Sequence, residues 1–156
     1  MRIPVTRHGS FGNAPFVEAV VFLRRFSTSS PIKFLVDTGC SHTTICENDA
    51  RRLGLDASKL KEPSMRSIGI GGNADERVIP GAVEISLAYG SEETRRIQFD
   101  GINILIDPRK EERDSISAGK EAFKLPSLLG RDFLSRLDCT LHFNFNHDET
   151  WVDVSD

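Results

Sequence analysis

The sequence predicts an all-β domain, a small barrel or a sandwich, with one or two short helices. Short segments rich in Val, Ile and Phe recur along the chain, and clusters of Gly, Pro, Ser and Asn separate them. Only two short stretches carry a helical pattern. With 156 residues the chain can bury one sizeable core, so we expect a single domain at residues 13–156 after an N-terminal arm at residues 1–12.

Apolar alternation and turn residues locate the expected strands. A glycine-rich centre in residues 64–80 indicates a hairpin, and the break at Gly101 suggests a β-bulge. The charged segment at residues 107–119 is expected to be a surface loop. In chain order the expected strands are 14–24, 32–36, the two arms of the hairpin in 64–80, 81–89, 95–106, 139–145 and 150–154.

Two segments carry helix signals. In Cys46–Leu53 acidic residues come first and basic residues last, and Gly54 follows, which is the order favoured by the helix dipole and by a glycine C-cap. The second segment, Arg131–Leu137, is expected to form one or two helical turns.

Composition excludes several classes of function. The net charge is −3 and the basic residues are scattered, so no nucleic-acid surface is expected. No apolar run has the length of about 18–20 residues that a membrane span needs, and the N-terminus lacks the apolar core of a signal peptide. Three widely spaced cysteines argue against a disulfide framework and indicate a reducing, cytoplasmic compartment.

The stretch Phe34–Ile45 contains the candidate site. Asp37 follows a run of apolar residues and precedes a turn expected at Thr38 and Gly39. Glycine permits a tight turn with unusual backbone angles, and an acid at the mouth of a buried strand is a candidate for a shifted pKa. The alternative is a β-turn in which Asp37 only caps backbone amides.

Three features follow one another in a fixed order. They are Asp37-Thr38-Gly39 after an apolar strand, the hairpin Ile68-Gly69-Ile70-Gly71-Gly72-Asn73, and Leu128-Leu129-Gly130 before Arg131-Asp132. In an all-β chain of this length the combination resembles the retropepsin-like aspartic proteases, the single-lobe relatives of pepsin. The resemblance extends from about Pro15 to Val154.

This resemblance implies a small closed barrel of the acid-protease type with one or two short helices, and it implies a role for each feature. Asp37 would be the catalytic aspartate, Thr38 would form a hydrogen bond across a dimer interface, and Gly39 would let the scissile peptide approach. The hairpin at residues 68–73 would be a flap that closes over a peptide or protein substrate. Residues 128–130 would pack behind the active-site loop, and the strands within 140–154 would help to build the subunit interface.

The chain contains only half of the carboxylate pair that this reaction needs. One carboxylate acts as general base on a water while the other protonates or polarises the carbonyl oxygen. No second apolar-Asp-(Thr/Ser)-Gly is present, because Phe99-Asp100-Gly101 lacks the hydroxyl residue. We therefore expect a homodimer with two Asp37 side chains on its two-fold axis, and no cofactor or metal. The alternative is a catalytically silent dimerisation or peptide-binding module of the same fold.

Two departures from the family pattern bear on this expectation. Cys40 stands where Ala or Ser is usual, and a thiol donates weakly to a neighbouring carboxylate. The candidate flap also lacks an aromatic residue near its tip.

Other chemistries remain as weaker alternatives. Cys40 and His42 could form a thiol nucleophile pair, and Cys139 and His142, with His147 or Cys46, could bind a metal. The glycines at 69–72 could cradle a phosphate, although a strand and not a helix follows them.

Overall fold

The computed structural model describes residues 2–9, 12–60, 66–69, 72–89, 93–106, 125–144 and 149–155. Within these ranges it confirms the all-β class, because strands dominate and the two α-helices, α1 (Glu47–Arg52) and α3 (Arg131–Leu137), are short. A membrane-crossing helix is not found in this part of the chain, since neither helix is long and apolar enough.

The strands form two sheets. β1, β11 and β10 make a small sheet, and the other eight strands make a large one in the order β2-β3-β4-β9-β5-β8-β7-β6. Two 3-10 turns, η2 (Arg24–Phe26) and η3 (Ala57–Lys59), lie between strands. The strands are β1 Arg2–Pro4, β2 Thr6–His8, β3 Ala14–Leu23, β4 Thr28–Val36, β5 Thr44–Cys46, β6 Arg66–Gly69, β7 Gly72–Tyr89, β8 Glu93–Ile106, β9 Ser127–Leu129, β10 Cys139–Phe143 and β11 Thr150–Val154.

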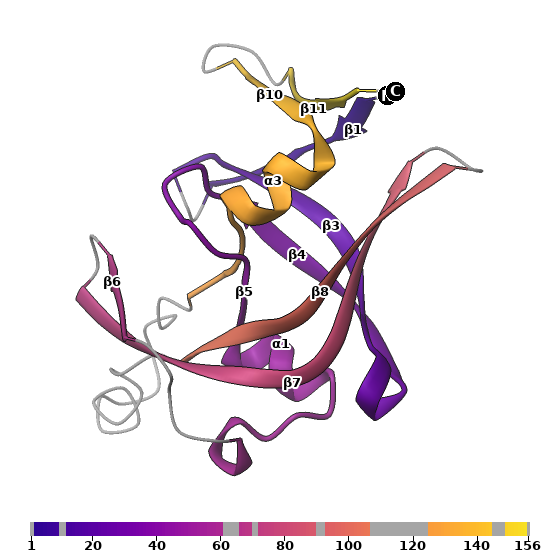
Figure 1. Ribbon diagram of the computed structural model, residues 1–156. Helices are drawn as coiled ribbons and strands as arrows, with labels where there is room; N and C mark the ends of the chain where they lie inside the picture. Colours follow the sequence, from indigo (N-terminus) through magenta and orange to yellow (C-terminus); the bar gives the residue numbers. More distant parts are fainter. Residues whose placement is uncertain are drawn as a thin grey trace.

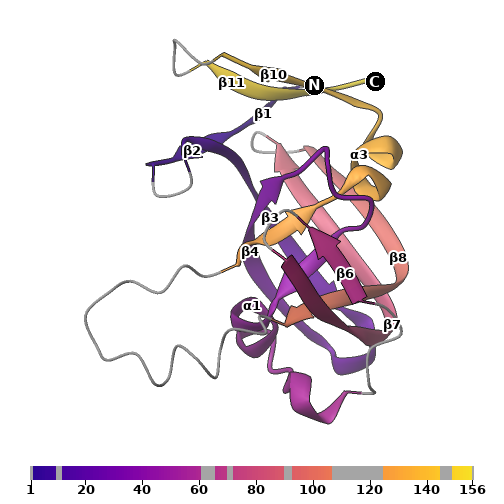
Figure 2. The ribbon, with the colours of Figure 1, turned by 90° about the vertical axis from the view of Figure 1, so that its left-hand side faces the viewer.

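Six strands of the large sheet pair in a closed ring (Figure 1). β3 pairs with β4, β4 with β9, β9 with β5, β5 with β8, β8 with β7, and β7 pairs again with β3. The link between β5 and β9 is a single position, Thr44 opposite Leu128. The expected closed barrel therefore takes the form of a ring of strands of unequal length, and Figure 2 shows the small sheet at one end of it.

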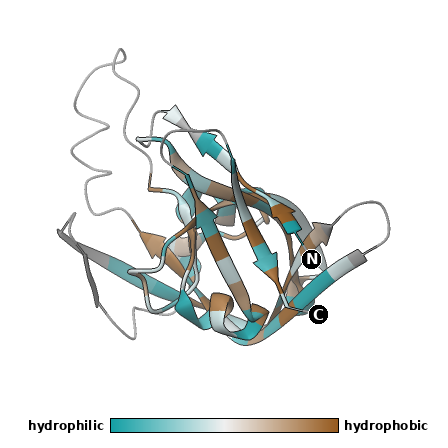
Figure 3. Cartoon of the chain, turned by 90° about the horizontal axis from the view of Figure 1, so that it is seen from above, coloured by the Kyte–Doolittle hydropathy of each residue, from teal (hydrophilic) through white to brown (hydrophobic). Residues whose placement is uncertain are grey.

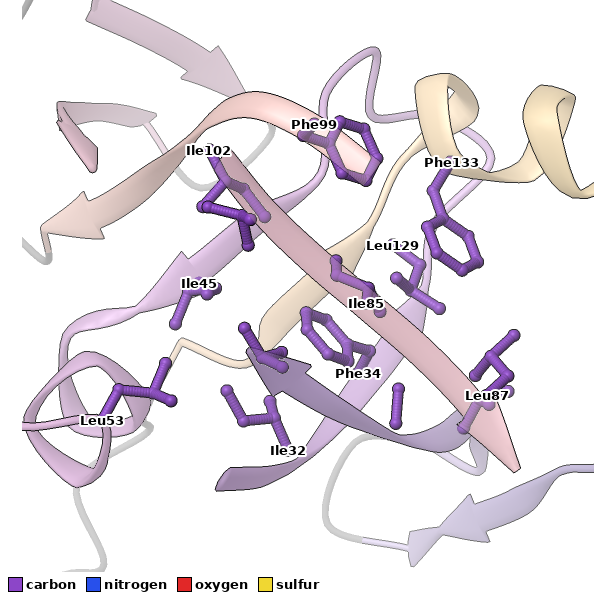
Figure 4. Packing of buried hydrophobic residues seen from close by; sticks show 14 of the residues in the cluster. Ile32, Phe34, Ile45, Leu53, Ile85, Leu87, Phe99, Ile102, Leu129 and Phe133 are labelled. Atoms are coloured by element: carbon purple, nitrogen blue, oxygen red, sulfur yellow. The ribbon is translucent and has the colours of Figure 1, made fainter. Parts of the chain in front are cut away.

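The ring encloses the hydrophobic core (Figure 4). In β4 burial alternates with the strand period, since Ile32, Phe34 and Val36 are buried while Lys33 is exposed. Figure 3 shows hydrophobic residues (brown) and hydrophilic residues (teal) interspersed along the strands. Each large apolar side chain removed from water contributes about 1.5–3 kcal/mol to stability. The fully buried large side chains are Phe34, Phe133, Leu23, Ile32, Ile45, Leu53, Ile79, Ile85, Leu87, Ile104, Leu129 and Val21.

The predicted helices are both present. In α1, Glu47 forms an ion pair with Arg51 one turn later (2.7 Å), and Gly54 beyond the helix has a positive φ of 77°. In α3, Phe133 is buried and its ring stacks on Phe99 at a centroid distance of 6.4 Å. This contact attaches α3 to β8, and it holds the residues just before the helix against the ring.

The expected N-terminal arm contains regular structure. β1 pairs with β11 and β2 pairs with β3, and Ile3 belongs to the core with 2% of its surface exposed. A strand of three residues is too short to show an alternating pattern in the sequence. The lack of such a pattern in residues 1–12 therefore did not indicate that strands are absent there.

The predicted bulge lies on the other strand of its pair. Gly101 is paired regularly with Pro80, and the register shifts between Pro80 and Val83 on β7. Gly81 within the shift has a φ of 94°, which only glycine adopts readily. β4 also begins earlier than the expected strand at 32–36, since residues 28–31 belong to it, and the chain turns at η2.

The hairpin expected at residues 64–80 is formed by β6 and β7. Its register pairs Ile68 with Asn73 and Gly69 with Gly72. Ile70 and Gly71 at its tip lie outside the described residues, and so does the expected surface loop at 107–119.

Candidate active site

Asp37 lies directly beyond the end of β4. β4 runs parallel to β9, with Val36 opposite Leu129, and the Asp37 amide donates to the Leu129 carbonyl at 3.1 Å. Val36 and Leu129 are buried, whereas Asp37 is half-buried. Two apolar strands therefore hold a carboxylate at the edge of the core, at the start of the active-site loop (residues 37–43).

One oxygen of the Asp37 carboxylate is fixed by backbone amides. Oδ1 accepts hydrogen bonds from Gly39 N (2.9 Å) and Cys40 N (3.2 Å). This is the amide-capping arrangement considered as an alternative. It occupies only one oxygen, and no described residue donates to Oδ2. The turn therefore orients the carboxylate and leaves Oδ2 for an outside group.

Gly39 is required for space and not for its backbone angles. Contrary to the expectation of an unusual turn conformation, its φ is not positive. A Cβ at this position would lie 3.2 Å from Asp37 Oδ1, closer than most real contacts. Any side chain here would press on the oxygen that the turn holds. Thr38, beside it, is exposed at the tip of the turn.

The Cys40 thiol faces the backbone and not the carboxylate. Sγ donates to the His42 carbonyl oxygen at 3.0 Å, so it does not form the bond to Asp37 that a Ser could form at this position. Burial raises the pKa of the Cys40 thiol, and the negative charges of Asp37, Glu76 and Asp132 raise it further. A raised pKa keeps the thiol protonated, which argues against the Cys40/His42 nucleophile pair.

The Cys40 thiol should consequently react slowly with alkylating agents. Only the thiolate reacts, so at any pH below the raised pKa a smaller fraction of Cys40 is reactive than in an unperturbed thiol. Timed iodoacetamide labelling across pH, followed by peptide mapping, should give a lower rate for the folded chain than for the chain in urea. Equal rates, or faster labelling of the folded chain, would contradict this account of the loop.

Asp132 and Thr43 join the active-site loop to α3, and the sequence did not indicate this pair. Asp132 Oδ1 accepts from Thr43 N (2.8 Å), Thr43 Oγ1 (2.7 Å) and Phe133 N (2.8 Å). The same Thr43 hydroxyl accepts from Gly130 N at 3.0 Å. An acid in the first turn of a predicted helix was the only available signal, because it suggests a side chain that bonds backbone amides.

Gly130 lies against the backbone of the active-site loop. A Cβ on Gly130 would come within 2.5 Å of the carbonyl carbon and 2.6 Å of the oxygen of His42. The next two residues continue the contact, since Arg131 N donates to Cys40 O (2.9 Å) and Asp132 N to Ser41 O (3.3 Å). The segment after β9 therefore lies directly against residues 40–42.

Leu128 and Leu129 point to opposite faces of the sheet. Leu129 is buried in the core with 1% of its surface exposed, whereas Leu128 is half-buried. Leu128 shares a face with Leu35 and Thr44, which are its partners on the neighbouring strands. Of the expected support residues, Leu129 and Gly130 lie behind the loop and Leu128 lies on the outer face beside it.

The residues of the alternative metal site have other contacts. Cys139 Sγ contacts the Leu134 carbonyl at 3.6 Å, and the His142 ring stacks on Trp151 with Nε2 3.0 Å from Asp153 Oδ2. In the part of the chain that the structure describes, no three His, Cys, Asp or Glu side chains are grouped as metal ligands. His147 lies outside that part.

One protein-family model matches most of the chain. The model of a family described as aspartyl protease matches residues 25–133, which include Asp37, the β6–β7 hairpin and Gly130. A search of curated proteins finds no match.

Among solved structures, a retropepsin-like aspartic protease from Rickettsia conorii aligns with 22% identity and a TM-score of 0.49 over 97% of this chain and 89% of that chain. The EIAV protease complexed with the inhibitor HBY-793 aligns with 17% identity and a TM-score of 0.49, over 83% of this chain and 93% of that chain.

Proposed function

Since this chain belongs to the aspartyl protease family, we propose that it is an endopeptidase that hydrolyses peptide bonds with a water activated by two Asp37 carboxylates. The observation that carries the proposal is the placement of Asp37. Its Oδ1 is held by two amides beyond the end of a buried strand, and Oδ2 receives no hydrogen bond from a described residue. A carboxylate fixed in this way is preorganised to hold a water.

The second carboxylate of the pair comes from another copy of the chain. In a symmetric dimer the two Asp37 side chains share one proton, so that one takes a proton from the water and the other donates to the carbonyl oxygen. Thr38 is exposed at the tip of the same turn, where its hydroxyl can reach the partner. The reaction needs no metal or other cofactor, and the attacking water forms a non-covalent tetrahedral diol.

In this proposal the hairpin at residues 68–73 closes over a bound peptide. β7 is the longest strand of the described chain and continues from the hairpin into the ring. The pairing of β7 with β8 therefore anchors the hairpin. The substrate is an extended segment of a peptide or protein. We also propose a cytoplasmic location, because Cys40, Cys46 and Cys139 are all free thiols, which fits a reducing compartment.

The test is hydrolysis of unfolded casein between pH 3 and pH 7 at several concentrations of the purified chain. Because each site needs two copies, activity per chain should rise with concentration and level off once the dimer is fully formed. Activity per chain that is constant down to concentrations at which size exclusion shows only monomers would contradict the shared site. A confirmed dimer without cleavage at any pH would favour the silent peptide-binding module.

A further inference from the structure

A polar cluster lies on three neighbouring strands next to the active-site loop. It consists of Thr44 on β5, Glu76 on β7 and Asn103 on β8. Thr44 is opposite Asn103 in the parallel pair β5–β8, and Asn103 is opposite Val78 in the antiparallel pair β7–β8. Glu76, two residues before Val78, lies on the same face, and Asn103 Nδ2 donates to its Oε2.

The polar cluster faces away from the hydrophobic core. Ile45 and Ile104, the next residues in β5 and β8, are fully buried in the core (Figure 4 labels Ile45). Alternation along each strand therefore turns Thr44 and Asn103 to the other face of the ring. Leu128, which is opposite Thr44, lies on that face beside the active-site loop.

Thr44 and Glu76 are buried and Asn103 is half-buried, yet one polar group of the cluster lacks a partner. Thr44 is only 1% exposed, and its hydroxyl makes no hydrogen bond to any residue in the described ranges. Glu76 is a charged side chain and is only 2% exposed. Burying a hydroxyl group without a hydrogen-bond partner costs free energy. The Thr44 hydroxyl therefore indicates that a polar group binds there.

The negative charge of the cluster acts on the active-site loop. Glu76, together with Asp37 and Asp132, raises the pKa of the Cys40 thiol, and burial is the larger cause. Cys40 is three residues after Asp37, so three carboxylates from different parts of the fold act on one short segment. A positive charge brought to this face is stabilised by the same field.

We propose that Thr44, Glu76 and Asn103 form a substrate subsite that accepts a cationic side chain, lysine or arginine, close to the scissile peptide bond. The cation donates hydrogen bonds to the Glu76 carboxylate and to Thr44 Oγ1, and the Asn103 amide orients the carboxylate. This inference rests on the proposed function, since it names the substrate class of the same site.

The experiment compares peptide selection by four full-length chains: wild type, Glu76→Gln, Thr44→Val and the control Glu84→Gln. Glu84 lies on the same strand β7 and pairs with Arg96 at the surface, so its substitution removes the same charge at a distance from the loop. Each chain digests a random decapeptide library, and mass spectrometry records the residues around each cut. Each substitution is also made in an Asp37→Asn background, and binding of the same library is measured.

Wild type and Glu84→Gln should enrich lysine or arginine about tenfold at one fixed position near the cut, and Glu76→Gln should lose this enrichment. Absence of any cationic preference, or equal loss in Glu84→Gln, would overturn the subsite. In a further outcome, wild type fails to cleave while the Asp37→Asn chain binds lysine peptides and the Asp37→Asn, Glu76→Gln double variant does not. In that case the subsite is supported and the proposed protease activity is contradicted. A chain that neither cleaves nor binds any peptide overturns both.

Thr44→Val keeps the test informative if Glu76→Gln does not fold. Valine has the shape of threonine without the hydroxyl, so the variant should melt at the same or a higher temperature while its enrichment of lysine or arginine falls. A lower melting temperature with unchanged selectivity would show that the hydroxyl bonds a structural water, and would overturn its role in the subsite.

Discussion

Asp37→Asn is expected to abolish peptide hydrolysis, with a loss in kcat/KM of at least about 10³-fold. Asparagine keeps an Oδ1 that can accept from Gly39 N and Cys40 N, so the turn should fold unchanged. It cannot take a proton from the water, and it cannot share one with the partner carboxylate. The measurement is the initial rate on unfolded casein, with circular dichroism and thermal melting as checks of the fold.

Asp56→Asn is the matched control for this substitution. Asp56 is exposed and accepts from Ser58 N at the start of η3, and asparagine caps such turns equally well. The control should hydrolyse casein at the wild-type rate. Activity that survives Asp37→Asn, or that is lost in both variants, would rule out Asp37 as the catalytic group.

Gly130→Ala is expected to destabilise the chain by about 3 kcal/mol, because the new methyl group collides with backbone and not with a movable side chain. The added Cβ would lie 2.5 Å from the carbonyl carbon of His42, 2.6 Å from its oxygen and 2.9 Å from its nitrogen. The loop and α3 must separate to accommodate it, so the hydrogen bonds from Thr43 to Asp132 should weaken as well. Thermal melting should show a decrease of roughly 6–12 °C for a chain of this size.

Gly9→Ala provides the comparison at an uncrowded glycine. The nearest atom to a Cβ at Gly9 is Asn13 Oδ1 at 4.0 Å, which is an ordinary contact, and its φ is not positive. Its melting temperature should match that of the wild type. If Gly130→Ala has the same melting temperature as Gly9→Ala, residues 128–130 do not hold the active-site loop.

The sequence was sufficient for the all-β class, for both helices and for the position of Asp37. These features depend on local signals: alternation in β4, the charge order and Gly54 in α1, and the apolar run before the Asp. Local signals repeat over a few residues, so a strand of three residues such as β1 shows none.

Contacts between distant residues were not available from the sequence. Thr43 and Asp132 are 89 positions apart, and the pairings of β9 with β4 and with β5 bring their segments together. The polar cluster likewise depends on the register of β5, β7 and β8. The backbone conformation of Gly39 was mispredicted for a related reason, since the space beside a carboxylate is a property of the folded turn.

The most direct test of the shared site is subunit mixing. Wild-type chains are refolded from urea with Asp37→Asn chains, and the hydrolysis rate is measured at a fixed amount of wild type. If each site needs two Asp37 side chains, mixed dimers are inactive. Activity should then fall to about half with an equal amount of the variant, and to about one tenth with a ninefold excess. A rate that does not change with added Asp37→Asn chains would contradict the shared site.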